Sequence, residues 1–516
     1  MSDPLFINGN GKSLETWLWE AACSIRGEID APKFKDFILP LIFVKRLSDV
    51  FDDELTALNE DRLIAEELVQ TDHSLVRFYV PNNARWPSFV NLTTNVGEYM
   101  TEAMRALAKE NPPLLGVVDT IDFNQSTSGQ RTISDDSLKK LIQILSKKRL
   151  GLQDVDPDLL GRAYEYLLRK FAEGSGQSAG EFYTPMEVAE LMAYIIDPQE
   201  GDEIYDPTCG TSGLLIKSNI RFKEKFGDLD RIDIPLPKFY GQEINRSTYA
   251  MAKMNSIIHD MTGTEIAIGD TMLRPAFRLS NGGLKTFTKV TANPMWNQKF
   301  EQSIYGKDPY DRFSFGLPPS NSADWGWIQH MFASMDNKGK LVVVIDTGSI
   351  SRGSGTEGSN REKEIRKKFV DRGLVESVVL LPENLFYNTT AAGVIITIRK
   401  NRGEQDGVFM INASGMFEKG RPKNFIPKDK VIDIFDIYSK KREAEDTSRL
   451  ISKEELIRAD YNLNPTLFIS RKTEDELIPI EEIIPQLRQL EAERKKNDVS
   501  VNDILKQLGY EGFLNE

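Results

Sequence analysis

The stretch that decides the fold is Asp202-Glu203-Ile204-Tyr205-Asp206-Pro207-Thr208-Cys209-Gly210-Thr211-Ser212-Gly213-Leu214-Leu215-Ile216. Its apolar start, its glycines and its apolar end predict a short strand, a tight turn and a helix with Ser212 as N-cap. Such a turn can form a ligand site, because Gly210 and Gly213 let the backbone approach a ligand and Asp206 can accept hydrogen bonds from it. By itself, the stretch fits an ordinary strand-to-helix connection equally well. It departs from Gly-x-Gly-x-x-Gly, so it does not predict a dinucleotide site.

Length and composition predict a globular protein of the cytoplasm. The 516 residues exceed one ordinary core and predict roughly two to four domains. No apolar run approaches the ~20 residues that a membrane span needs, and residues 1–4 lack the features of a secretory signal. Two cysteines cannot form a disulfide framework, and three histidines leave few ligands for zinc. We therefore expect a reducing compartment, no membrane association and no metal site.

The net charge of −13 argues against a protein that grips nucleic acid alone over a broad surface. Such binding depends on Lys and Arg side chains that neutralise phosphates. Short basic clusters such as 147–149 and 440–442 are typical of solvated faces. Nucleic-acid binding would therefore need a local basic groove or a basic partner.

The hydrophobic pattern divides the chain into three parts. In residues 1–172, apolar residues recur at spacings of three and four and predict an α-helical domain. Small residues at 173–180 indicate a hinge or lid. Residues 173–426 alternate short apolar runs with helical stretches, which predicts an α/β domain with a doubly wound, Rossmann-like, mostly parallel sheet. Residues 427–516 return to helices and form a C-terminal helical extension.

Seven apolar runs are the expected strands of the sheet. They are 203–205, 239–242, 266–269, 287–292, 341–345, 375–381 and 394–398. The last two runs leave no room for a crossover helix, so they predict an antiparallel pair at the sheet edge.

Near the C-terminus, apolar residues form two helical stripes. The first contains Ile480, Ile483, Ile484, Leu487 and Leu490, and the second contains Val501, Ile504, Leu505 and Leu508. Pro485 should interrupt the first helix or start a new one. Such stripes either pack on their own domain or dock a partner helix.

Five short signals follow one another around the predicted sheet, four of them at strand ends. They are 180–185 (Gly-Glu-Phe-Tyr-Thr-Pro), the opening stretch with Asp206, two strand ends that carry Glu243 and Asp270, and 290–296 (Val-Thr-Ala-Asn-Pro-Met-Trp). Open α/β sheets bind ligands at the carboxyl ends of their strands, so we expect these residues to converge. A second Asn-Pro run, at residues 111–114, has no strand before it and no aromatic at its fourth position, and predicts a helix stop and a turn.

The ordered set resembles the motifs of S-adenosylmethionine-dependent adenine-N6 DNA methyltransferases, in particular the modification subunit of type I restriction–modification systems. The resemblance covers nearly the whole chain. It includes the helical stretch 34–49, the approach 161–168 (Gly-Arg-Ala-Tyr-Glu-Tyr-Leu-Leu), the run 381–386 (Leu-Pro-Glu-Asn-Leu-Phe) and the late run 460–465.

The resemblance implies a binding role for residues in each signal. Those at the cofactor's methionine side are Phe182, Tyr183, Thr184 and Pro185; those of the turn are Asp206, Thr208, Gly210, Thr211, Ser212 and Gly213. Asp206 and the backbone around Gly210 would hold the cofactor's amino-acid end. Glu243 would accept from the ribose hydroxyls and Asp270 from the adenine amino group, as carboxylates can.

Asn293, Pro294 and Trp296 are the catalytic candidates. An adenine amino nitrogen is a poor nucleophile, and two acceptors on its N–H groups, the Asn293 amide oxygen and the Pro294 carbonyl, would return electron density to it. Trp296 would stack on the extruded base. The run departs from the family's Asn-Pro-Pro-aromatic at Met295, which removes a fixed φ. Ser212 and the long interval between Asp206 and Glu243 are further departures.

The resemblance implies an enzyme that methylates adenine in double-stranded DNA as one subunit of a complex. A specificity subunit would read the target sequence, and a restriction subunit with nuclease and translocase activity would accompany it. Two alternatives stay open at this stage. One is a cofactor-binding structural or sensing subunit with little turnover, and the other is a methyltransferase that acts on RNA, protein or cytosine.

Overall fold

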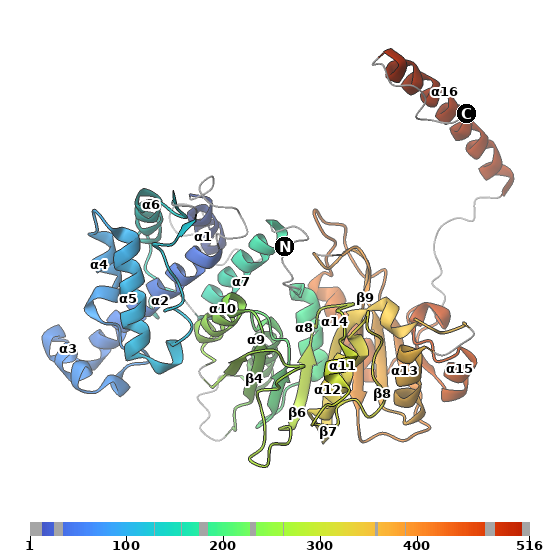
Figure 1. The fold of residues 1–516 in the computed structure, drawn as a ribbon, viewed down its shortest axis with the longest axis horizontal. Coiled ribbons are helices and arrows are strands. Elements are labelled where there is room, and N and C mark those ends of the chain that lie inside the picture. The colour runs from blue at the N-terminus through green and yellow to red at the C-terminus, as the bar shows by residue number, and fades with distance from the viewer. Residues whose placement is uncertain are drawn as a thin grey trace. The chain divides into compact units, whose positions relative to one another are not determined.

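The computed structural model describes residues 13–24, 35–127, 130–155, 157–174, 184–227, 234–261, 263–356, 360–387, 389–469 and 480–507. The chain divides into two compact units, Met1–Ile469 and Ser470–Glu516. Figure 1 shows the ribbon with its helices and strands labelled. Phe182 and Tyr183 of the expected cofactor site lie outside the described residues.

The N-terminal part of the first unit is helical, as predicted. Its α-helices are α1 (Leu14–Cys23), α2 (Lys35–Leu58), α3 (Arg62–Thr71), α4 (Trp86–Val90), α5 (Val96–Glu110), α6 (Asp135–Leu145) and α7 (Pro157–Gly174). Short 3-10 turns η2 (His73–Leu75), η3 (Asn82–Ala84) and η4 (Pro112–Leu114) and a small hairpin of β1 (Ser126–Thr127) and β2 (Gln130–Arg131) complete it. The predicted helix stop at Asn111 is confirmed, since α5 ends at Glu110 and η4 follows.

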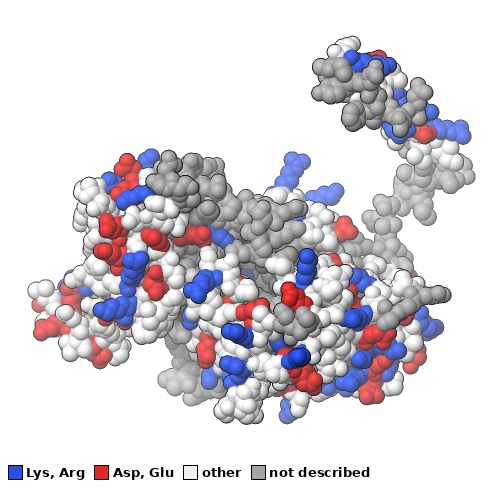
Figure 2. All heavy atoms as spheres, viewed as in Figure 1, with Lys and Arg blue, Asp and Glu red and all other residues white. Residues whose placement is uncertain are grey.

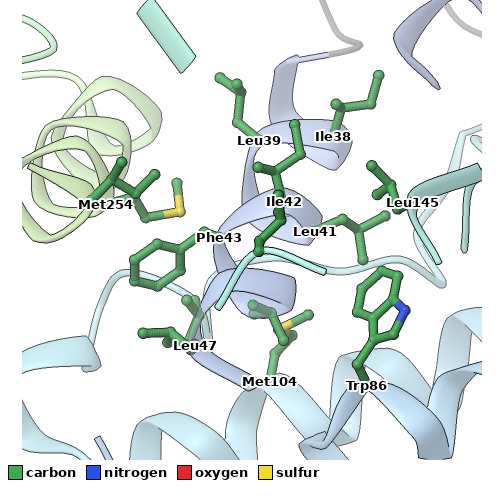
Figure 3. Packing of buried hydrophobic residues seen from close by; sticks show 14 of the residues in the cluster. Ile38, Leu39, Leu41, Ile42, Phe43, Leu47, Trp86, Met104, Leu145 and Met254 are labelled. Atoms are coloured by element: carbon green, nitrogen blue, oxygen red, sulfur yellow. The ribbon is translucent and has the colours of Figure 1, made fainter. Parts of the chain in front are cut away.

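The core of this helical part is organised around α2. Most residues of α2 from Phe37 to Phe51 are buried, which matches an apolar helix packed on several sides. Figure 3 shows Phe43 of α2 beside Met254, a residue of α10 (Arg246–Ile258), while Leu41 lies near Trp86. One hydrophobic cluster therefore joins the N-terminal helices to a helix of the α/β part.

Within the described residues, nine strands form one mixed sheet in the order β11-β10-β8-β9-β7-β6-β3-β4-β5. They are β3 (Glu203–Asp206), β4 (Lys238–Glu243), β5 (Glu265–Ile268), β6 (Phe287–Ala292), β7 (Met335–Asp346), β8 (Val375–Leu380), β9 (Gly393–Arg399), β10 (Val408–Asn412) and β11 (Ser448–Ile451). The strands β7, β6, β3, β4 and β5 are parallel to one another. The predicted Rossmann-like α/β sheet is confirmed.

Helices cover both faces of this sheet. They are α8 (Met186–Ile196), α9 (Gly213–Phe226), α10, α11 (Gln302–Tyr305), α12 (Asp324–Ala333), α13 (Arg361–Asp371), α14 (Lys428–Lys440) and α15 (Lys453–Arg458). Along β7, Val343 and Ile345 join a cluster with α12 and α13, whereas Val342 and Val344 join a cluster with α8 and α14. Alternate side chains of the strand are therefore buried on opposite faces, as expected for a central strand between two helical layers.

One prediction about the sheet is wrong in part. The strands β8 and β9 are antiparallel, as expected, but they do not form the edge of the sheet. β9 lies between β7 and β8, and the run 408–412 adds β10 parallel to β8. β11 then pairs with β10 and takes the edge. The apolar run Val408-Phe409-Met410-Ile411 was the sequence signal for this strand, and it was missed.

Residues 427–469 pack on the sheet. α14 shares a hydrophobic cluster with α8, and β11 is a strand of the same sheet. The expected boundary at 427 therefore divides elements that lie together, and the second compact unit begins at Ser470. We propose that the C-terminal extension begins there, and we keep the division near residue 172 as a proposal.

The extension contains α16 (Ile480–Gln507), which continues through Pro485. The prediction that this proline interrupts the helix is wrong: Pro485 lies inside α16, and the helix continues although the proline lacks one backbone N–H donor. Both apolar stripes lie on this one helix, and Leu487, Leu490 and Ile504 are exposed. Leu508 is outside the described residues. In the part of the chain that the structure describes, every helix is too short or too polar to cross a membrane.

Arg366 on α13 fixes the late part of the chain to the sheet. Its buried guanidinium donates to the Tyr461 carbonyl at 2.7 Å, the Ser349 carbonyl at 3.0 Å, the Arg352 carbonyl at 3.1 Å and the Ser354 hydroxyl at 2.7 Å. Burial lowers the pKa of Arg366 to about 10, which leaves it charged at pH 7. One cation thus satisfies acceptors from two segments that are far apart in sequence, 349–354 and the loop at Tyr461.

We expect Arg366→Ala to lower the free energy of unfolding by about 3 kcal/mol or more, because several buried acceptors lose a charged donor. Chemical denaturation measures the change. Arg361→Ala is the matched control, since Arg361 is an exposed residue of the same helix and should change stability by less than about 0.5 kcal/mol. Equal stability of the two variants would contradict the role given to Arg366.

Candidate active site

The carboxyl ends of four parallel strands meet at one edge of the sheet. Asp206 ends β3 and pairs in register with Gly241 of β4, while Glu243 ends β4 and pairs with Ile268 of β5. β6 lies on the other side of β3, and Asn293 follows it directly. The predicted convergence of these strand ends is confirmed.

The turn after β3 has the tight geometry that its glycines predict. The Thr208 N–H donates to Asp206 Oδ1 at 2.9 Å, and the Ser212 N–H donates to the Cys209 carbonyl at 2.7 Å. Gly210 has φ 53° and Ser212 has φ 68°, so both adopt the left-handed conformation. Ser212 occupies the N-cap position of α9, as predicted, but its hydroxyl makes no capping hydrogen bond, since an N-cap side chain needs an extended backbone.

Glu243 and Asp270 lie at the neighbouring strand ends and are held by backbone donors. Glu243 accepts from the Gly210 N–H at 3.1 Å and from the Asn245 N–H at 2.7 Å. Asp270 accepts from the Leu273 N–H at 3.1 Å. These contacts fix the direction of both carboxylates, and each remains partly accessible to solvent.

Asn293 is joined to the signal at 180–185 through Thr184. Its Nδ2 donates to the Thr184 hydroxyl at 3.0 Å. Its Oδ1 accepts from the Trp296 indole N–H at 3.2 Å. The amide is therefore held at both ends, and the oxygen keeps a second lone pair for another donor.

Trp296 is more enclosed than a ring that stacks on an extruded base would be. The residue is only 8% exposed, and its ring packs on Phe386 with centroids 4.6 Å apart. A Cβ added at Gly393 would lie 2.8 Å from Phe386 and 3.1 Å from Trp296, so a glycine is needed for this contact. Met295, which replaces the family's second proline, is partly exposed.

One pocket gathers several of the predicted residues. Its lining residues are Glu165, Leu168, Thr184, Met186, Ala189, Asp206, Thr208, Cys209, Gly210, Thr211, Gly213, Leu214, Lys217, Asn255 and Asn293. The pocket therefore brings Thr184, the turn after β3 and Asn293 together. Pro185, Ser212, Glu243, Asp270, Pro294 and Trp296 do not line it. Pro185, Pro294 and Trp296 are buried next to lining residues, whereas Glu243 and Asp270 lie at the strand ends beside it.

Asp206 is an unusual carboxylate because it is almost completely buried. Burial, with a smaller contribution from the charge of Glu243, raises the pKa of Asp206 to about 7, although its hydrogen bond with Thr208 opposes the shift. The ionised form of such a carboxyl group is stabilised when a cation binds beside it. A perturbed acid in a pocket is typical of a functional site.

Three polar residues of the pocket are not among those predicted from the sequence. Glu165 comes from α7, Lys217 from α9 and Asn255 from α10. Glu165 lies among the apolar residues Ala163, Tyr164 and Leu167, and a charge inside an apolar stretch was the available signal. Lys217 is one helical turn beyond Gly213, and nothing in its sequence context distinguishes it from a solvated lysine.

Family models and sequence relatives of this chain point to the same protein family. Residues 155–477 match the model of the N-6 DNA Methylase family, and residues 14–145 match that of the HsdM N-terminal domain. The chain is 30% identical over 494 residues to the MjaVIII type I restriction enzyme methylase subunit of Methanocaldococcus jannaschii. This alignment covers 92% of this chain and 81% of that protein. It is 25% identical over 537 residues to the MpnII methylase subunit of Mycoplasma pneumoniae, with 96% of each chain covered.

Solved structures agree with these relatives. The type I restriction-modification system methyltransferase subunit from Streptococcus thermophilus aligns with a TM-score of 0.75 and 26% identity over 89% of this chain and 99% of that one. A modification subunit of a type I restriction enzyme from Vibrio vulnificus shares the fold, with a TM-score of 0.61 and 18% identity over 88% of this chain and 97% of that one. The chain therefore belongs to the N-6 DNA methylase family and is an adenine-specific DNA methyltransferase, the modification subunit of a type I restriction–modification system.

Proposed function

We propose that this chain methylates an adenine flipped out of double-stranded DNA at Asn293, with S-adenosylmethionine as the methyl donor. The observation that carries the proposal is the position of Asn293, whose amide lines the same pocket as the buried Asp206 and is oriented by Thr184 and Trp296. One pocket thus contains the Asn293 amide, which can accept a hydrogen bond from an amino group, and the Asp206 carboxylate, which can pair with a cation.

The residues present fit S-adenosylmethionine. This cofactor carries a sulfonium cation and an amino acid at one end, and ribose hydroxyls and an adenine amino group at the other. Asp206 offers a buried carboxylate in the pocket, and the backbone at Gly210 and Gly213 leaves room for a ligand. Glu243 and Asp270 offer carboxylates at the next two strand ends for hydroxyl and amino donors. We assign Thr184, Pro185 and the turn 206–213 to the methionine side.

Asn293 would act by accepting from the adenine amino group. Its Oδ1 already accepts from Trp296 and can accept one further hydrogen bond, and the Pro294 carbonyl is the proposed second acceptor. Two acceptors shift electron density toward the amino nitrogen and hold its lone pair in line with the methyl group. When bound, S-adenosylmethionine would supply that methyl group from its sulfonium, which leaves a neutral thioether, and the methylated nitrogen would release one proton to water. Positioning of this kind can supply several kcal/mol of the barrier.

Trp296 has two proposed roles, and only one of them requires a conformational change. Stacking on a flipped base requires its ring to be uncovered from the residues around it. The hydrogen bond to Asn293 is already formed. We therefore assign Trp296 first to the orientation of the Asn293 amide and second to base stacking.

The proposed partners follow from the charge and from α16. Basic and acidic side chains are interspersed on the face shown in Figure 2, with no extended basic stripe there. With a net charge of −13, the chain alone is a weak ligand for DNA. We propose that a specificity subunit reads the DNA sequence and docks on the exposed apolar residues of α16, and that a restriction subunit joins the complex in the cytoplasm.

The proposed chemistry predicts opposite outcomes for the two Asn-Pro runs. Asn293→Ala should abolish methyl transfer and leave cofactor affinity nearly unchanged, since the proposed role of its amide is at the transferring nitrogen. The loss of its hydrogen bonds with Thr184 and Trp296 should lower the unfolding temperature as well. Asn111→Ala should keep the rate per folded molecule but lower the unfolding temperature. Asn111 is buried, with hydrogen bonds to both backbone groups of Tyr79 and to the Leu107 carbonyl.

Single-turnover methyl transfer to duplex DNA, with the specificity subunit present, measures the rates, and calorimetry measures the unfolding temperatures. A wild-type rate for Asn293→Ala would remove the catalytic assignment. Cofactor binding by the wild-type chain without any methylated DNA would favour the structural or sensing alternative.

For Trp296→Phe, we expect the rate of the chemical step to fall about tenfold, because a lost hydrogen bond of about 1.4 kcal/mol lets the Asn293 amide rotate. Cofactor affinity should stay unchanged. Trp327→Phe is the matched control, since Trp327 is also buried and its indole donates to Gln298 Oε1 at 3.1 Å, away from Asn293. Equal losses in the two variants would show a general packing effect instead.

The raised pKa of Asp206 predicts a pH-dependent cofactor affinity. A bound cation favours the ionised carboxylate, so the protonated form at low pH must release its proton on binding. With a pKa of about 7 in the free protein, affinity should fall by about tenfold between pH 8 and pH 6. Calorimetric titration in buffers of different ionisation enthalpy should show this proton release.

The cofactor's own amino group also titrates near pH 8. The ratio of wild-type to Asp206→Asn affinity removes that contribution, because the ligand is the same in both titrations. This ratio should rise with pH and level off above about pH 8. A ratio that is flat from pH 6 to pH 8 would contradict the assignment of Asp206.

A further inference from the structure

Glu165 reaches the cofactor pocket from a helix of the N-terminal core. Leu160, Tyr164 and Leu167 of α7 are buried in the cluster that also contains α2. Glu165 is 5% exposed and lines the pocket. Gly161, one turn earlier, allows the approach of α10, because a Cβ there would lie 2.1 Å from the His259 ring. The packing of α7 against α10 therefore fixes where this carboxylate lies.

Glu165 forms a buried ion pair with Lys217 that is incomplete. Lys217 Nζ lies 2.9 Å from Glu165 Oε2, with side chains 11% and 6% exposed. Glu165 Oε1 has no hydrogen-bond partner among the described residues, and the His259 ring nitrogen lies 3.9 Å from it. A buried carboxylate oxygen without a donor is costly, so it indicates an absent ligand.

Asn255 adds a second acceptor of the same kind. Its Nδ2 donates to the Thr211 carbonyl at 3.0 Å, which ties α10 to the turn after β3. Its Oδ1 is fully buried and has no hydrogen-bond partner within the described part of the chain. The pocket wall thus offers an amide oxygen, a carboxylate oxygen and an ammonium group.

These three groups line the same pocket as the turn 206–213, which the proposed mechanism assigns to the methionine side. Asn293 and Thr184 take the reacting end, and Glu243 and Asp270, which do not line the pocket, take the ribose and adenine. The wall built by α7, α9 and α10 is left for the portion of the cofactor beyond its sulfur. That portion is an amino acid, with one ammonium and one carboxylate.

We propose that Glu165 and Lys217 bind the ammonium and the carboxylate of the cofactor's amino-acid end. Glu165 Oε1 and Asn255 Oδ1 accept from the ammonium, and Lys217 donates to the carboxylate. The charges are complementary, because a neutral ion pair in the wall meets a neutral zwitterion, and every buried charge then gains an opposite neighbour. This inference rests on the proposed cofactor and adds residues that act on its tail.

Two thioether nucleosides test the inference by calorimetric titration of the full-length chain. S-adenosylhomocysteine carries the amino-acid end, and 5′-deoxy-5′-methylthioadenosine lacks it. Glu165→Gln and Lys217→Met should each weaken S-adenosylhomocysteine about tenfold to hundredfold, the scale of a charged hydrogen bond. Both variants should bind 5′-deoxy-5′-methylthioadenosine within twofold of wild type, which also shows that they fold.

Lys225→Met is the matched control for Lys217→Met, since Lys225 lies on the same helix and pairs with Asp197 at 2.9 Å outside the pocket. It should leave both affinities unchanged. Equal weakening of the two nucleosides by Glu165→Gln, or no weakening of either, would overturn the proposal. If the wild-type chain binds neither nucleoside, the cofactor assignment itself fails and the inference with it; binding of 5′-deoxy-5′-methylthioadenosine separates the two failures.

Discussion

Parallel pairing of β6, β3, β4 and β5 is the constraint on which the site depends. Parallel strands all end at the same edge, and their central residues are buried between two helical layers. The polar side chains at these strand ends, Asp206, Glu243 and Asn293, are therefore brought to one edge of the sheet. The position of the candidate site therefore follows from where these buried strands end.

The helical N-terminal part is joined to this edge through α10. Its Met254 belongs to the hydrophobic cluster of α2, while its Asn255, one residue later, holds the Thr211 carbonyl in the turn after β3. Within α10, Met254 thus packs in the N-terminal core and the adjacent residue, Asn255, lines the pocket. This arrangement links the packing of the helices to the geometry of the turn after β3.

Buried charges in this protein fall into two classes. Arg366 is surrounded by acceptors and stabilises the connection of distant segments. Asp206 and Glu165 are buried in a pocket with fewer donors than they can accept. The first class is satisfied by the fold, and the second is satisfied only when a ligand supplies the opposite charge or a donor. We propose that this difference separates structural from functional charges more clearly than burial does.

The sequence by itself determined the helical and α/β parts, five parallel strands and the order of the site motifs, because these depend on local periodicity and on residue types at strand ends. It also separated Asn293 from Asn111, since a strand precedes one and a helix precedes the other. The position of β9 inside the sheet, the enclosure of Trp296 and the approach of Glu165 and Lys217 to the pocket were decided only by the tertiary structure. Each of these depends on contacts between segments far apart in the chain, and a local pattern of side chains carries no information about which distant segment will cover it.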